Sequence, residues 1–431
     1  MNKKTFPIVN DAACLYKWSW STLFLNRGTT ASCHRGFHWK LNKDTLKDFH
    51  NHPGKIGDRE KMLDGVWPGN GCEYCRNVES AGGVSDRTGF ANNSIELLPP
   101  ELAINPKETH VSPTLLEVYF TNVCNQSCVY CSPGFSSQIE QEVRKYGESK
   151  FNYDYSHFQA DDRENYDEYV KQFWEWMHEH STDLQILNTL GGEPMYQKEF
   201  EQHLDFFETH SNPNLIWRIF SNLNHDTTKF KEKIDRIQKL IDAGKLKCLE
   251  ITGSIDCWGP QLEYARYGLN LDNCETNINT LLASPGITFQ IHATLTPVTL
   301  TSFHQLITKI CSDWMIKKPW PGVNMNWNTV VRPDCFDVYN FGKYLIPYID
   351  KAIDTLNSFN DDRVLQKHDN SIQSLTGIKK QMENTPVDIK SVNNLVGFLD
   401  DLDVRRNLDW KKIYPDIVEI INTINTENKN V

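Results

Sequence analysis

Long apolar runs are missing from this sequence. No stretch of roughly 18 consecutive apolar residues occurs, and this is the length that a membrane-spanning helix needs. The first residues, MNKKTFPIVNDAACLYKW, are charged at the start but contain neither a continuous apolar segment nor a small-residue cleavage site. Since a secretory leader requires both features, we predict a soluble, cytoplasmic protein with no membrane partner.

An excess of positive charge is also missing. The 431 residues include 45 Lys and Arg against 56 Asp and Glu, which gives a formal net charge of -11. This balance argues against a general surface for polyanions, so nucleic acid is not an expected partner. Internal repeats and low-complexity segments are absent too, and the 39% of hydrophobic residues can fill a large core. The composition therefore excludes a disordered chain.

Cysteine, by contrast, is plentiful. The chain contains 12 cysteines, and in a reducing cytosol such a number indicates metal ligation or thiol chemistry rather than disulfides. The cysteines that stand alone in the second half of the chain are expected to be small core residues: Cys248, Cys257, Cys274, Cys311 and Cys335.

Three further cysteines lie close together in TNVCNQSCVYC, residues 121–131, with no fourth cysteine or histidine nearby. On a short loop, Cys124, Cys128 and Cys131 can converge on one centre. Structural zinc takes four protein ligands, whereas three thiolates can hold a [4Fe–4S] cluster and leave its fourth iron open to a substrate or cofactor. We therefore predict an iron–sulfur cluster here, with a zinc site as the alternative.

After residue 110, β-rich runs alternate with helical patterns. Strands are expected at 115–120, 184–190, 215–222, 248–256, 288–296 and 323–331, and helices at 166–180, 199–210, 229–244, 273–284 and 303–315. This alternation predicts an α/β fold with a parallel sheet and right-handed crossovers. Six units are too few for a closed eight-fold barrel, so we expect a partial (βα)6 barrel. Residues 132–162, which follow the cysteines, are expected to form a long loop.

The CxxxCxxC spacing directly after the first strand, with Tyr130 before the last cysteine, resembles the radical S-adenosylmethionine (SAM) superfamily. The resemblance implies that the three cysteines hold a [4Fe–4S] cluster, whose open iron chelates SAM. One-electron reduction then yields a 5′-deoxyadenosyl radical that abstracts hydrogen from the substrate, so the cofactor carries the difficult chemistry. The second strand ends in Gly191-Gly192-Glu193-Pro194, which is similar to the GGEP motif that binds the SAM amino group in this superfamily.

The resemblance also implies SAM contacts at the ends of later strands, from Ser221, Asn222, Ser254, Asp256, Arg266 and Thr294. A guanidinium–carboxylate fork gives Arg266 a physical reason to bind the SAM carboxylate, and a surface ion pair is the alternative. Ser254 and Asp256 can equally belong to a helix cap or turn. Thr294 is placed at the adenosine end of the site.

Four cysteines precede the predicted barrel: Cys14, Cys33, Cys72 and Cys75. The first two flank an aromatic segment with a hairpin turn at Asn26-Arg27-Gly28, and the last two form a CxxC. Four such ligands suit zinc or a second iron–sulfur cluster.

The segment GVWPGNGCEYCRNVESAGGVSDR, residues 65–87, resembles the auxiliary-cluster modules called SPASM and twitch domains, with Glu79, Ser85 and Arg87 in the matching places. It departs from them in position, because SPASM modules usually follow the barrel. The resemblance implies a second [4Fe–4S] cluster held by these four cysteines.

We therefore expect a cysteine-rich auxiliary module at 1–110, a radical SAM partial barrel at 111–335 and a helical extension at 336–431, with helices at 341–359, 370–384 and 410–425. The resemblance implies a radical SAM enzyme that modifies a peptide or protein and receives electrons from a flavodoxin or ferredoxin. A sugar, nucleotide or other small metabolite is the alternative substrate. A zinc-stabilised binding or scaffold protein is the alternative of another class. The sequence does not identify a catalytic side chain.

Overall fold

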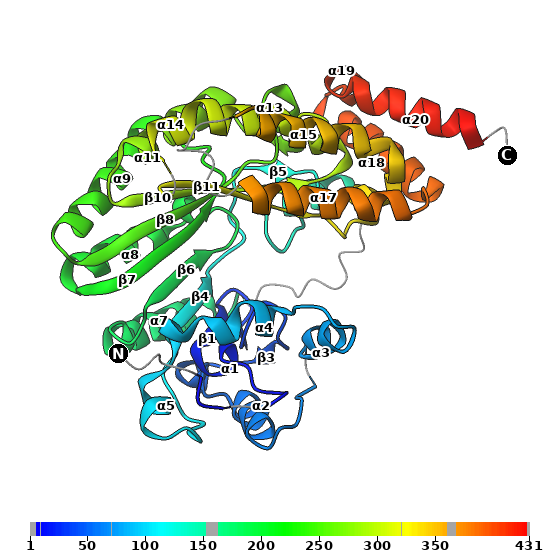
Figure 1. Ribbon diagram of the computed structural model, residues 1–431. Coiled ribbons are helices and arrows are strands. Elements are labelled where there is room, and N and C mark those ends of the chain that lie inside the picture. Colours follow the sequence, from blue (N-terminus) through cyan, green and yellow to red (C-terminus); the bar gives the residue numbers. More distant parts are fainter. Residues whose placement is uncertain are drawn as a thin grey trace. The chain divides into compact units, whose positions relative to one another are not determined.

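The computed structural model describes residues 6–8, 10–69, 71–151, 163–319, 321–359 and 368–428, without the side chains of residues 368 and 369 (Figure 1). Two compact units divide the chain. The first contains Met1–Thr121, Gln159–Ile219 and Leu240–Leu249, and the second contains Asn122–Phe158, Phe220–Lys239 and Glu250–Val431. The predicted module boundaries at 110/111 and 335/336 each fall inside a unit.

A sheet forms the centre of the first unit. Its strands follow the order β3-β2-β1-β4-β6-β7-β8, and their bounds are β1 Trp20–Phe24, β2 Thr29–Ala31, β3 Trp39–Lys40, β4 Leu115–Tyr119, β6 Ile186–Leu190, β7 Asn212–Ser221 and β8 Leu246–Ser254. The pairs β1–β4, β4–β6 and β6–β7 are parallel. The unit boundary runs through β7 and β8, so the last residues of both strands belong to the second unit.

The predicted N-terminal hairpin is present, since β1 and β2 pair in antiparallel fashion. Gly28 has a φ of 57°, a left-handed conformation that glycine adopts without strain. The sequence did not predict that β1 also pairs with β4, from Trp20 opposite Leu115 to Phe24 opposite Tyr119. The hairpin is therefore an extension of the main sheet.

Two helices of this unit, α7 (Tyr166–His180) and α8 (Lys198–Thr209), have the buried apolar stripe that their spacing predicts. They meet where the Phe173 ring lies 6.2 Å from the His203 ring. Phe120 contacts Phe173 and His203 edge-on, at centroid distances of 5.3 and 5.4 Å. The remaining elements of the unit are α1 Tyr16–Ser19, η1 Leu46–Asp48, α2 Pro53–Leu63, α3 Glu73–Ser80, α4 Asp86–Gly89, η2 Ala91–Asn93, η3 Ile95–Leu97, α5 Pro100–Ile104 and η5 Pro194–Tyr196.

The second unit contains the strand order β8-β10-β11 and a short two-stranded sheet. The bounds of its strands are β5 Ser127–Cys128, β9 Arg266–Tyr267, β10 Ile287–Leu295 and β11 Val323–Thr329. β10 and β11 are parallel, as predicted. In the part of the chain that the structure describes, β11 has β10 as its one neighbour and forms an open edge.

Many helices complete the second unit, and α13, α15 and α17 pack as successive neighbours (Figure 1). The elements are α6 Ser137–Tyr146, α9 Thr227–Asp242, α10 Pro260–Ala265, α11 Leu271–Ala283, α12 Pro297–Leu300, α13 Phe303–Lys309, η6 Ile310–Trp314, α14 Met315–Lys317, η7 Asp334–Phe336, η8 Val338–Leu345, α15 Ile346–Ser358, α17 His368–Asn384, α18 Ile389–Arg406, α19 Trp410–Ile413 and α20 Pro415–Asn428.

The six predicted strands are confirmed, with small shifts at their ends. The predicted helices are also found, but three of them are divided: 303–315 into α13, η6 and α14, 341–359 into η8 and α15, and 410–425 into α19 and α20. The chain is an α/β protein with a parallel sheet. The prediction of a continuous loop over 132–162 is wrong for α6. This helix begins after Ser136, whose hydroxyl accepts from the Ile139 amide at 3.3 Å, and ends at Gly147 with a φ of 79°. Residues 152–162 of that segment lie outside the described residues.

Candidate functional site

The loop with Cys124, Cys128 and Cys131 belongs to the second unit and is held by a short strand pair. β5 pairs with β9 in antiparallel fashion, which places Cys128 opposite Arg266. The ladder continues where the Val129 amide donates to the Ala265 carbonyl at 2.9 Å. The Cys131 amide donates to the Cys128 carbonyl at 3.0 Å, so the last two cysteines lie on one tight turn.

A buried carboxylate organises the residues around this loop. Asp256 is 0% exposed and accepts four hydrogen bonds. Two come from Arg266, whose Nε and Nη2 lie 2.9 and 2.8 Å from the carboxylate oxygens. The others come from the Tyr130 hydroxyl at 2.6 Å and the Thr294 amide at 2.9 Å. The network therefore ties β9, β10 and the cysteine loop to one point.

Arg266 reaches from this network to a cysteine. Its Nη1 donates to Cys128 Sγ at 3.7 Å, while its fork is occupied by Asp256. Burial by itself would lower the pKa of Arg266, but Asp256 raises that pKa well above its usual value. Arg266 is thus a permanent buried cation, and the surface ion pair considered from the sequence is excluded because the side chain is 6% exposed.

Two thiols of the loop, those of Cys128 and Cys131, have raised pKa values that favour the neutral form when no metal holds them. Burial raises the pKa of Cys128, although Arg266 opposes the shift. The pKa of Cys131 is raised to about 12, mainly by burial and to a smaller extent by the Cys128 thiol. Because metals bind the thiolate, a bound cation would have to displace these protons.

Asparagines fix the other end of the loop. Asn222 donates to Asn125 Oδ1 at 2.7 Å and lies 3.9 Å from Cys124 Sγ. Asn125 in turn donates to the Asn224 carbonyl at 2.7 Å. Gly268 has a φ of 99°, and a Cβ there would lie 2.9 Å from the Asn125 carbonyl oxygen. The loop therefore fits closely against the chain that follows β7 and β9.

The other predicted SAM contacts of this unit have more local positions. Ser221 Oγ accepts from the Leu223 amide at 3.0 Å, which closes a turn after β7. Ser254 is half-buried at the end of β8. Thr294 reaches Asp256 through its backbone amide rather than its side chain. None of these contacts is a helix cap. The helix-cap role that the sequence left open for Asp256 is therefore excluded.

The GGEP segment lies in the first unit, directly after β6. The Gly192 amide donates to the Thr121 carbonyl at 3.1 Å. Gly191 has a φ of 141°, and a Cβ there would lie 2.7 Å from the same oxygen, so glycine is required. Glu193 is buried, and its carboxylate accepts from the Met195 amide at 3.3 Å. Pro194 opens the short helix η5.

One face of β10 is polar although parallel strands are normally apolar on both faces. Buried apolar residues alternate there with half-buried polar ones: Thr288, Gln290, His292 and Thr294. Gln290 Oε1 accepts from Thr252 Oγ1 at 3.4 Å, and His292 bonds to Asn326 on β11. Burial lowers the pKa of His292. This face presents neutral hydrogen-bonding groups.

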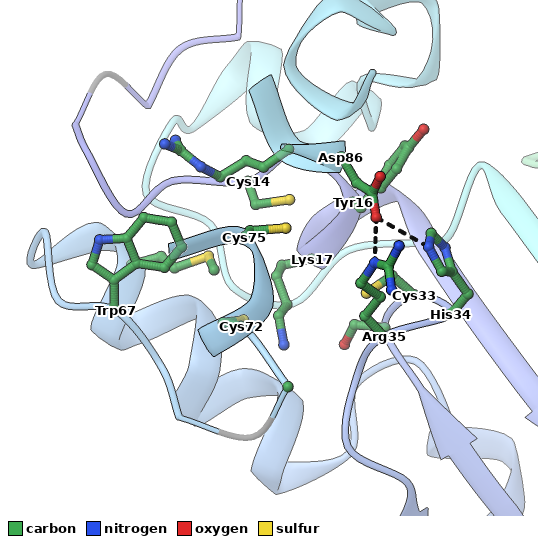
Figure 2. Close-up of a pocket in the computed structure, with 14 residues that line it drawn as sticks. Cys14, Tyr16, Lys17, Cys33, His34, Arg35, Trp67, Cys72, Cys75 and Asp86 are labelled. Atoms are coloured by element: carbon green, nitrogen blue, oxygen red, sulfur yellow. Dashed lines mark hydrogen bonds and ion pairs between the residues drawn. The ribbon is translucent and has the colours of Figure 1, made fainter. Parts of the chain in front are cut away.

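The first unit contains a cavity lined by all four N-terminal cysteines, Cys14, Cys33, Cys72 and Cys75 (Figure 2). Its volume is about 30 Å³, roughly the room of two waters. The pKa of Cys14 is raised to about 12, mainly by burial and to a smaller extent by the neighbouring Cys33 thiol. Burial raises the pKa of Cys72 to about 11, with Cys33 and Cys75 acting in the same direction. The four thiols are thus close enough to affect one another.

A network of hydrogen bonds positions these cysteines. Glu79, on the helix that carries Cys75, accepts from Arg87 Nε at 3.0 Å and also bonds Ser85 Oγ. Arg87 Nη1 donates to the Ala13 carbonyl at 2.9 Å, next to Cys14. The three residues that resemble the twitch pattern therefore link α3 to the segment before α1.

The chain just before Cys72 and Cys75 lies closely against the backbone at Arg35, two residues after Cys33. Gly71 has a φ of 91°, and a Cβ on it would lie 2.0 Å from the Arg35 carbonyl oxygen. Only glycine fits at this position. In the described residues, no group of three or more His, Cys, Asp and Glu converges tightly enough to hold one metal ion. The cysteines surround a space rather than a point.

The comparisons with known proteins do not identify a family. No protein-family profile matches this chain, and no curated protein matches it. A solved structure of TYW1 with a lysine–pyruvate adduct bound aligns with 56% of this chain and 73% of that one, at 11% identity and a TM-score of 0.28. A TM-score this low does not establish a shared fold. Among the described residues, no helix is long and apolar enough to cross a membrane.

Several residues that shape these sites were not predicted. Asn125 could have been noticed because it lies between two cysteines of the loop. Gln197 could have been noticed because it closely follows GGEP, and its Nε2 donates to the Thr121 carbonyl at 3.2 Å. Lys17 lies one helical turn after Cys14 and lines the cavity. Asp58, which pairs with Lys17, gives no signal in the sequence because 41 residues separate them.

Proposed function

We propose that this protein is a radical SAM enzyme that holds a [4Fe–4S] cluster on Cys124, Cys128 and Cys131. The observation that carries the proposal is the position of Arg266, which donates to Cys128 Sγ at 3.7 Å from within a buried network. A cluster ligated by three thiolates is anionic, and a fixed cation beside one thiolate stabilises it. When bound and reduced, such a cluster supplies the electron that cleaves SAM.

The chain's own residues would bind and orient the cofactors. Tyr130, Asp256 and Arg266 hold the cysteine loop in one conformation. Gly191 and Gly192 fix the turn after β6 against the Thr121 carbonyl, and we propose that GGEP binds the SAM amino group. Ser221, Asn222, Ser254 and Thr294 remain proposed contacts for the rest of SAM.

We also propose a second [4Fe–4S] cluster on Cys14, Cys33, Cys72 and Cys75. The arrangement supports it, because all four cysteines line one cavity. A single zinc ion would draw four thiolates to one point, and no such convergence occurs among the described residues.

The substrate that we propose is a side chain of a peptide or protein, with a sugar, nucleotide or other small metabolite as the second candidate. The polar face of β10 and β11 supports either, because its threonine, glutamine, histidine and asparagine side chains can bind amide or hydroxyl groups. We propose a flavodoxin or ferredoxin as the electron donor and a cytoplasmic location.

An anaerobic reconstitution tests the proposal. The full-length protein is loaded with iron and sulfide, its iron is counted, and formation of 5′-deoxyadenosine from SAM is measured with dithionite as the reductant. We expect about eight irons for two cubane clusters and cleavage of SAM. The variant with Cys124, Cys128 and Cys131 all changed to Ala should keep about half of the iron and lose cleavage.

A matched control separates ligation from general loss of cysteine. Cys311→Ala removes another buried thiol of the same unit and should leave iron content and SAM cleavage unchanged. Colourless protein with stoichiometric zinc and intact SAM would contradict the proposal and favour the zinc-stabilised scaffold.

A further inference from the structure

A buried group of basic side chains lies beneath the N-terminal cysteine cavity. Lys17, Lys55 and Arg59 are 3%, 0% and 0% exposed, and Asp58 among them is 2% exposed. Lys17 Nζ is 2.7 Å from Asp58 Oδ2. Lys55 donates to two hydroxyl groups, Ser21 Oγ at 2.9 Å and Thr30 Oγ1 at 2.7 Å. Such burial of basic groups requires a compensating negative charge.

The charges of this region do not balance without another anion. Burial lowers the pKa of Lys55 well below its usual value, so Lys55 contributes little charge. Burial also lowers the pKa of Arg59, but only to about 9, so it stays cationic at neutral pH. Lys17 and Arg59 therefore face the single carboxylate of Asp58.

The remaining charged residues of the cavity wall are already paired. Arg35 Nε bonds Asp86 at 2.5 Å, and Arg87 forms an ion pair with Glu79. Arg59 donates to the Lys17 and Thr109 carbonyls rather than to a carboxylate, so this buried group keeps one surplus positive charge. Thiolates that ligate a metal centre would supply the missing negative charge.

Lys17 is the cation placed to act on that centre. It lies three residues after Cys14, its amide donates to the Cys14 carbonyl at 3.0 Å, and its side chain extends between the cysteines (Figure 2). Its Nζ lies 2.7 Å from Asp58 Oδ2, and Lys17 is 3% exposed. This buried ion pair holds the ammonium group at the cavity wall.

We propose that Lys17, held in place by Asp58, raises the reduction potential of a four-cysteine iron–sulfur centre in this cavity. The inference rests on the second cluster of the proposed function. Adding one electron makes such a centre more negative by one charge, and a fixed buried cation stabilises the reduced form more than the oxidised form. Since four cysteines occupy all four irons, the centre would transfer electrons without binding substrate.

Redox titration followed by EPR spectroscopy tests this role without relying on catalysis. The background is the full chain with Cys124, Cys128 and Cys131 changed to Ala, so that only the N-terminal centre is observed. Lys17→Met should shift the redox equilibrium toward the oxidised form at least tenfold, which is about 59 mV for a one-electron couple. Asp58→Asn should shift it the opposite way, because Lys17 then loses its counter-charge.

Two controls make the outcome decisive. Lys17→Arg keeps the charge and should restore a potential near that of the parent, which also covers the case in which Lys17→Met fails to fold. Lys61→Met removes an exposed cation from the same helix as Asp58 and should have no effect.

The two proposals fail in different ways. Absence of iron from the parent variant, or zinc in its place, would overturn the second cluster itself. An iron–sulfur signal whose potential is the same in Lys17→Met, Asp58→Asn and the parent would overturn the role of Lys17 alone.

Discussion

Replacing Asp256 by Asn tests the buried network around the cysteine loop. The substitution preserves shape but removes the charge that balances Arg266. The carboxylate accepts four hydrogen bonds, and an amide nitrogen in place of Oδ2 would face the Arg266 Nε–H, donor against donor. Arg266, which is 6% exposed, would then be a buried cation with no anion.

The expected cost is about 3–5 kcal/mol, the range for removing one partner of a buried ion pair. A loss of about 3 kcal/mol raises the equilibrium population of the locally open state roughly a hundredfold, since about 1.4 kcal/mol corresponds to a factor of ten. Hydrogen exchange at the Val129 amide, which bonds the Ala265 carbonyl at 2.9 Å, reports this opening. The Val118 amide in β4 of the first unit should keep its exchange rate. Iron bound by the loop should fall in parallel.

Two variants isolate the charge effect. Asp256→Asn combined with Arg266→Met removes both charges and should recover most of the lost protection, because no unpaired ion remains. Asp235→Asn makes the same substitution in an exposed pair with Lys231 and should cost less than about 1 kcal/mol. Equal protection in wild type and Asp256→Asn, or an additive loss in the double variant, would refute the reasoning.

Three other sites give further predictions. Burial raises the pKa of the Glu117 carboxyl from 4.5 to about 7. The folded state therefore holds this proton more tightly than the unfolded state. The contribution of the protonated carboxyl to the free energy of unfolding, roughly 3 kcal/mol, is fully present below pH 4.5 and is lost as pH rises through 7. Glu117→Gln should flatten that part of the stability curve, measured by urea unfolding at pH 5 and 8. Gly71→Ala should cause loss of metal from the N-terminal centre, because the new Cβ would lie 2.0 Å from the Arg35 carbonyl oxygen. Gly82 has a similar φ but open space around it, so Gly82→Ala should retain the metal. Elemental analysis measures the metal content of both variants. Gly191→Ala should weaken SAM binding in calorimetry by distorting the turn after β6; unchanged affinity would contradict the proposed GGEP contact.

Much of the fold could be predicted because its signals are local. The six strands show as short β-rich runs, and α7 and α8 have apolar stripes with helical spacing. The helix α6 was missed although Ile139, Val143 and Tyr146 recur at helical spacing; only Ile139 of its residues is buried. Its cap at Ser136 and the glycine at 147 were further signals.

The candidate site was predictable in its residue types but not in its partners. Tyr130, Asp256 and Arg266 were all expected to contribute, yet the sequence placed Arg266 on SAM, whereas its fork holds Asp256 in the structure. Nothing local distinguishes these options, because the partners of an arginine depend on which strand ends meet in space. The same reason hid the pair of Lys17 and Asp58.

The pairing of β1 with β4 gives a physical reason for the unusual position of the cysteine module ahead of the main strands. Five residues of β1 lie in parallel register with all of β4, from Trp20 opposite Leu115 to Phe24 opposite Tyr119. The Thr22 hydroxyl donates to Glu117 at 2.7 Å from this strand, so β1 also satisfies a buried carboxyl group of β4. Without β1, β4 would expose an unpaired edge and Glu117 would lose a hydrogen bond. The segment that carries Cys14 is therefore built into the same sheet as the strand that leads into the cysteine loop.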